Sequence, residues 1–113
     1  MSDNDKKQEK PLENPEIFVT AVPKDDRNPE HKKAASVAEK IVREEIKKAV
    51  KQSEPGGKSK QFDAAESEVK KAGQGTDPKK IDRIRVRVVG KDEDGDGVAK
   101  EWAVTPKEGK PRP

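Results

Sequence analysis

The sequence predicts a small α+β protein: a three-stranded sheet in the chain order β-α-α-β-β, with one long amphipathic helix packed on one face and disordered termini. Three observations predict this class. Apolar and charged residues alternate over residues 83–88, which is the period of a strand. A stripe of apolar residues with steps of three and four follows Pro29, which is the period of a helix. Both ends of the chain are polar and rich in charge.

Composition bounds the domain organisation. The chain has 113 residues, of which 43% are charged and 27% hydrophobic, and 26 basic side chains against 23 acidic ones leave a net charge of +3. This composition is close to that of disordered chains, but the charges nearly cancel and the apolar residues gather in blocks. We therefore expect one domain over residues 15–106, with flexible loops at 54–60 and 73–80 and disordered charged tails at 1–14 and 107–113.

The same composition bears on location. No apolar run approaches the roughly 20 residues of a membrane span. The N-terminal segment contains no apolar stretch of the kind found in a secretory signal, and the chain has no cysteine. We therefore expect a cytoplasmic protein without disulfides.

The first two elements are a strand and a long helix. Residues 15–22 contain the nearly continuous apolar run Ile17–Val22, which predicts a strand with both faces at least partly covered. Asn28 and Pro29 then predict a helix start, because asparagine caps helices and proline suits the first helical position. The helix is expected to end near Ser53. Its apolar stripe consists of Ala34, Val37, Ala38, Ile41, Val42, Ile46, Ala49 and Val50.

A shorter helix and a hairpin complete the chain. The shorter helix is predicted by the spacing of Phe62, Ala65, Val69 and Ala72, and Gly73 ends it. Residues 81–89 and 98–105 predict two antiparallel strands. Charged side chains meet charged ones, and apolar meet apolar, when Val86 lies opposite Trp102 and Arg87 opposite Glu101. We expect that register or a slip of two residues from it.

The apolar face of this hairpin and the stripe of the long helix have no other large partners. The core expected from this pairing consists of Ile41, Ile46, Val86, Val88 and Trp102. The sequence places Phe18 and Phe62 in the core as well. Because such a core is small, we expect the monomer to be marginally stable and association through a sheet edge or face to stabilise the fold.

Motifs that carry catalytic chemistry are few. His31 is the single histidine and falls in the first turn of the long helix, where we expect it to be solvated. Without cysteine it cannot complete a typical zinc site. The run Gly56–Ser59 has the ending of a phosphate-binding loop but lacks the upstream glycine and strand. Glu44 and Glu45 diverge by about 100° on a helix, so they cannot form a catalytic pair. We expect no enzymatic activity.

The main candidate site is the row Arg83, Arg85 and Arg87. These side chains project from one face of the predicted strand over ~13 Å. Such a row can contact phosphates or an acidic protein. Nucleic-acid contact is expected to be directed to the backbone and tolerant of sequence, because the aromatic residues needed for stacking are assigned to the core. The alternative is a solvated face of a structural or oligomerising module without a ligand.

The second candidate is the acidic turn of the hairpin. Asp92, Asp94 and Asp96 take the first, third and fifth positions of a calcium-binding loop, with Gly97 at the sixth. The twelfth position, which requires a bidentate glutamate, is Ala103. The sequence therefore favours a plain hairpin turn, with a weak calcium site as the alternative. No other cofactor is expected.

Lysines gather at the end of the long helix and just beyond it. They are Lys47, Lys48, Lys51, Lys58 and Lys60. Positive charge at the C-terminal end of a helix complements the helix dipole, so these lysines are explained without a ligand. An unspecific contact with phosphate is the alternative. The interpretation that the sequence supports best is a small non-enzymatic protein that binds a nucleic-acid backbone or an acidic protein through its three strand arginines.

Overall fold

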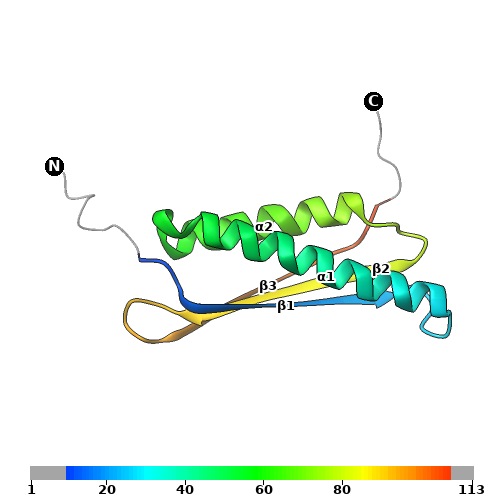
Figure 1. Ribbon diagram of the computed structural model, residues 1–113, viewed down its shortest axis with the longest axis horizontal. Helices are drawn as coiled ribbons and strands as arrows, with labels where there is room; N and C mark the ends of the chain where they lie inside the picture. Colours follow the sequence, from blue (N-terminus) through cyan, green and yellow to red (C-terminus); the bar gives the residue numbers. More distant parts are fainter. Residues whose placement is uncertain (1–9, 108–113) are drawn as a thin grey trace, which may run out of the picture.

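The computed structural model describes residues 10–107, which form two layers, a sheet and a pair of helices (Figure 1). The elements are β1 (Glu13–Pro23), α1 (Pro29–Gln52), the 3-10 turn η2 (Glu54–Gly56), α2 (Gly57–Gly75), β2 (Ile81–Lys91) and β3 (Gly97–Val104). The predicted α+β class and the order β-α-α-β-β are confirmed. Both helices cover the same face of the sheet (Figure 1). The parts of the predicted tails at 1–9 and 108–113 lie outside the described residues.

The sheet is antiparallel, with β2 between β1 and β3. Val86 lies opposite Trp102 and Arg87 opposite Glu101, so the predicted hairpin register is confirmed. This register keeps apolar side chains together on the face beneath the helices.

The predicted coverage of both faces of β1 is wrong. Ile17 and Ala21 are buried beneath the helices, whereas Phe18 points to the other face and is 51% exposed. Since α1 and α2 pack on one face of the sheet, the pleat of β1 sends alternate residues of its apolar run to solvent. Phe18 is therefore not a core residue.

α1 begins where the capping signal predicts. The Asn28 side-chain oxygen accepts hydrogen bonds from the backbone N–H groups of Glu30 at 2.8 Å and His31 at 3.4 Å. His31 is half-buried rather than solvated, and its Nδ1 atom has no hydrogen-bond partner in the described part of the chain. Neither α1 nor α2 is long and apolar enough to cross a membrane.

Two side chains of α1 bind the backbone of β1. Glu39 Oε2 accepts a 2.9 Å hydrogen bond from the N–H of Ala21, and Arg43 Nε donates one of 3.2 Å to the carbonyl oxygen of Ile17. β1 is an edge strand, and unpaired backbone groups on such a strand are the sites at which a further strand adds. The helix therefore blocks part of this edge.

Residues 54–60 are helical, whereas the sequence predicts a loop there. They form η2 and the first turn of α2, and α2 continues to Gly75, so the predicted loop at 73–80 begins only after its first three residues. The start of α2 is held in the fold in two ways. The Lys58 N–H donates a 3.1 Å hydrogen bond to the carbonyl oxygen of Lys10. The side chain of Gln61, one turn further along the helix, is fully buried.

Leu12 belongs to the core and is 4% exposed. The predicted tail at 1–14 therefore extends too far, because the chain is already part of the fold at Lys10 and Leu12. A single apolar residue in a polar segment gives no periodic signal. Its burial depends on distant parts of the chain, since its N–H binds Gln61 of α2 and its side chain lies beside Gly90 of β2.

The core prediction is half correct. Ile46 is fully buried in one cluster with Val86 and Val88, whereas Ile41 is 56% exposed. α1 lies over β1, and α2 lies over β3. Trp102 of β3 is therefore half-buried against Phe62 of α2, at 6.4 Å between ring centroids. The expected contact between Ile41 and this tryptophan does not form, because α2 occupies the space.

Candidate anion-binding face of the sheet

The face of the sheet opposite the helices carries the predicted arginine row. Arg83, Arg85 and Arg87 are exposed, and the apolar residues between them on β2 are buried. We call this surface the arginine face and define it by the three arginines and their cross-strand neighbours. These neighbours are Phe18, Thr20, Val22, Glu101 and Ala103.

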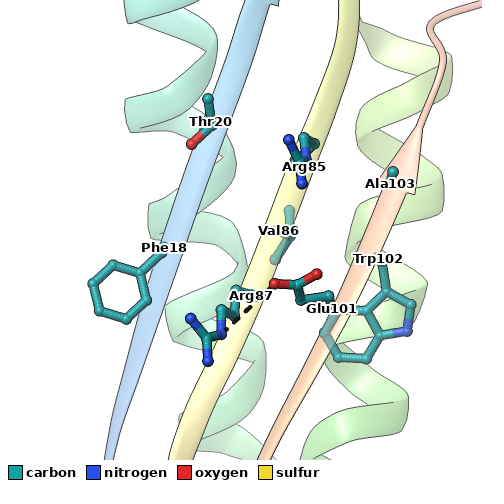
Figure 2. A pocket seen from close by; sticks show the side chains of 8 residues that line it. All are labelled: Phe18, Thr20, Arg85, Val86, Arg87, Glu101, Trp102 and Ala103. Carbon is teal, nitrogen blue, oxygen red and sulfur yellow. Dashed lines mark ion pairs between the residues drawn. The ribbon is translucent and has the colours of Figure 1, made fainter.

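A hollow of about 440 Å³ lies on the arginine face around Arg85 and Arg87 (Figure 2). Arg85 stands between Thr20 of β1 and Ala103 of β3. Because both neighbours are short, they leave room for a ligand beside the Arg85 guanidinium. Figure 2 shows the Phe18 ring on the β1 side of this hollow, across β1 from Arg87.

The three guanidinium groups differ in their ion-pair partners. Arg87 Nε lies 3.7 Å from Glu101 Oε2, and Arg83 Nε lies 3.6 Å from Asp82 Oδ2. Both arginines are more than half exposed, and such surface pairs contribute about 0–1 kcal/mol. Within residues 10–107, no carboxylate forms an ion pair with Arg85. An incoming anion therefore meets least competition at Arg85 and weak competition at its two neighbours.

Phe18 is the functional candidate that sequence reasoning missed. Because the run Ile17–Val22 is almost entirely apolar, its pattern does not indicate which residues point to the buried face. Thr20 is the residue that could have indicated an exposed face. It is polar, and in a strand it points to the same side as Phe18, two residues before it. The structure adds an exposed aromatic ring to a surface that the sequence describes as arginines alone.

The acidic turn is closed by its own hydrogen bonds. Asp92 Oδ1 accepts from the N–H groups of Asp94 and Asp96 at 2.9 Å each, and the Asp92 N–H donates to the carbonyl oxygen of Asp96 at 2.9 Å. Gly95 has a φ of +83°, which favours glycine. Carboxylate oxygens of the three aspartates lie within 4.8 Å of one another. One of the three carboxylates already serves the backbone of the turn, as a hairpin tip requires.

The lysines at the end of α1 lie in the helical layer, on the opposite side of the sheet from the arginine row (Figure 1). Lys47 nevertheless reaches the edge of the sheet, where it lines a hollow together with Arg43 and Phe18. Lys58 Nζ lies 3.4 Å from Glu93 Oε1 and joins α2 to the hairpin turn.

No protein-family model, curated protein or solved structure matches the chain.

Proposed function

We propose that this protein is a non-enzymatic binding protein whose arginine face holds a single-stranded nucleic acid. The observation that carries the proposal is Phe18, exposed on the same face as the arginines. Sheets that bind single strands combine cationic side chains for the phosphates with exposed aromatic rings on which bases stack. Phe18 is the stacking platform, while Arg85 and Arg87 contact phosphates.

Electrostatics supports contact with phosphate. Alternate residues of β2 place the Cα atoms of successive arginines about 6.6 Å apart on one face of the strand. Arginine binds phosphate through two parallel N–H donors, which makes it a stronger phosphate ligand than a point charge. With a net charge of only +3, attraction comes from this local row rather than from the protein as a whole.

The shape of the arginine face favours a single strand over a duplex. The face is an open sheet surface, and neither α1 nor α2 projects from it to enter a groove (Figure 1). A base can reach the Phe18 ring only when it is free of its own stack. We therefore expect little dependence on sequence, because stacking on one ring accepts any base.

The salt dependence of binding tests the phosphate contacts. Labelled oligouridine and oligothymidine are titrated with the full chain by fluorescence anisotropy, starting near 50 mM salt. The variant Arg85→Ser/Arg87→Ser is expected to flatten the slope of log K against log salt by about 1.4, at about 0.7 for each lost contact with a single strand. The matched control, Lys51→Ser/Lys60→Ser, removes the same charge from exposed positions of the helical layer and is expected to keep the slope.

The stacking contact has its own variant. Phe18→Ala is expected to weaken binding about 5- to 150-fold, the equivalent of one stacked base, without changing the salt slope. Because Phe18 is exposed, the fold should not depend on it, and circular dichroism checks this. Failure of the wild-type chain to bind either oligonucleotide at the lowest salt overturns the proposal. Tighter binding of polyglutamate than of the oligonucleotides would assign the face to an acidic protein instead.

A further inference from the structure

A second unpartnered surface lies on the outer side of α1. Val37 is 47% exposed and Ile41 is 56% exposed, although both are large apolar residues on the helix that builds the core. Beside them, a hollow of about 440 Å³ separates α1 from the segment that follows α2. We call this surface the α1 groove. Its apolar residues are Ala34, Val37, Ala38, Ile41 and Ile81.

The α1 groove exists because the two helices differ in length. α1 has 24 residues and α2 has 19, and α2 ends at Gly75. The N-terminal turns of α1 therefore extend past the end of the shorter helix (Figure 1). A longer α2 would cover the apolar stripe of α1 at these turns, but here the stripe is exposed to solvent. Exposed apolar patches of this kind mark interaction surfaces.

The charges around Val37 and Ile41 are self-complementary. The midpoint of these two residues is position 39, with Glu30 nine positions before it and Lys48 nine positions after it. At about 100° per residue, these four side chains point within about 20° of one direction from the helix. All four are exposed. A surface with opposite charges at equal distances from its centre fits an inverted copy of itself.

A second pair of charges follows the same rule on one flank. Lys33 lies six positions before the midpoint and Glu44 five positions after it, and both are exposed. At about 100° per residue, both point about 40–60° to the same side of the apolar pair. In an inverted copy, Lys33 of one chain therefore reaches Glu44 of the other.

We propose that a second copy of this chain covers the α1 groove, with the two α1 helices antiparallel about a two-fold axis at residue 39. In this dimer, Val37 packs on the partner's Ile41, Glu30 faces the partner's Lys48, and Lys33 faces the partner's Glu44. The interface is isologous, so each contact occurs twice. Parallel helices would instead set Glu30 against Glu30 and Lys48 against Lys48.

Two other surfaces, the arginine face and the β1 edge, fit a second copy less well. Pairing of two arginine faces would bring the guanidinium groups of both copies together, which is unfavourable. The β1 edge is partly occupied by Glu39 and Arg43 of the same chain. Association through α1 leaves both arginine faces on the outside of the dimer. The inference therefore does not depend on the proposed function.

The mass in solution tests this dimer. Sedimentation equilibrium of the full chain, from low micromolar to near millimolar concentration, is expected to show the mass rising from 12.5 kDa toward twice that value. Ile41→Glu is expected to hold the mass at the monomer value, because it sets two carboxylates against apolar side chains. Phe18→Glu changes an exposed apolar residue on the other face and serves as the matched control, which should still dimerise.

A charge exchange tests the orientation. Lys33→Glu and Glu44→Lys each create two like-charge contacts and are expected to raise the dimer dissociation constant several-fold, whereas the double variant restores opposite charges and the wild-type constant. Lys33 is preferred to Glu30 for this test, since acidic residues in the first turn also stabilise the helix. A monomer at every concentration, a dimer that survives Ile41→Glu, or a double variant weaker than both single ones would each overturn the proposal.

Discussion

The buried side chain of Gln61 accepts a 2.8 Å hydrogen bond from the backbone N–H of Leu12, which lies 49 residues earlier in the chain. Its amide also donates a 3.0 Å hydrogen bond to the carbonyl oxygen of Val50. One side chain on α2 thereby connects the segment entering β1 with the last turns of α1. This amide is therefore one of the contacts that hold Leu12 against the helical layer.

Gln61→Leu is expected to reduce the free energy of unfolding by about 2–4 kcal/mol. The substitution leaves the Leu12 N–H and the Val50 carbonyl buried without this partner, at about 1–3 kcal/mol for each such group. Urea unfolding monitored by circular dichroism measures the loss. Gln74→Leu, at an exposed position of the same helix, is the control and should stay within about 0.5 kcal/mol of the wild type. Equal stability of the two variants would contradict the role given to Gln61.

Ile46→Ala and Ile41→Ala form a matched pair on one helix. Ile46 has no exposed surface, so its truncation is expected to cost about 2–5 kcal/mol. Ile41 is more than half exposed, and its truncation should cost less than about 1 kcal/mol when unfolding is measured at a concentration where the chain is monomeric. Equal losses would mean that α1 is rotated relative to the orientation described.

Gly73→Ala is expected to destabilise the protein by about 1–3 kcal/mol, the usual cost of overpacking. A methyl group at Gly73 would overlap the side chain of Val104, where α2 approaches the end of β3. Gly75 ends the same helix with no atom near the position of an added methyl group. Gly75→Ala is therefore expected to be neutral or slightly stabilising. Thermal unfolding of the two variants side by side checks the close approach of α2 to β3.

Calcium at a few millimolar is expected to leave the melting temperature unchanged. A ligand that binds only the folded state would raise it, but the acidic turn lacks a carboxylate at the twelfth loop position, and Asp92 already accepts two backbone hydrogen bonds. Asp92→Ala should destabilise the hairpin by about 1 kcal/mol, as the loss of a backbone-capping side chain does elsewhere. Asp94→Ala should leave the stability of the hairpin unchanged, because the side chain that accepts these backbone hydrogen bonds is that of Asp92. A calcium-dependent rise in melting temperature that Asp94→Ala abolishes would restore the metal-site hypothesis.

Local sequence patterns were sufficient to predict the hairpin and the long helix. The alternation of Arg85, Val86 and Arg87 assigns each residue to a face through the two-residue period of a strand, and matching these faces to Trp102 yields the register. Asn28 and Pro29 define the start of α1 through bonds made within one turn. In each case the interactions that decide the structure lie close together in the sequence.

The sequence by itself therefore determined the α+β class, the hairpin register and the exposed arginine row, because each depends on short-range periodicity. Tertiary structure decided which face of β1 is covered, how far α2 extends along α1 and where Leu12 lies. Those choices exposed Phe18 and Ile41. Both residues belong to apolar patterns that fit a buried position equally well. Burial depends on which element lies opposite, and that element comes from a distant part of the chain.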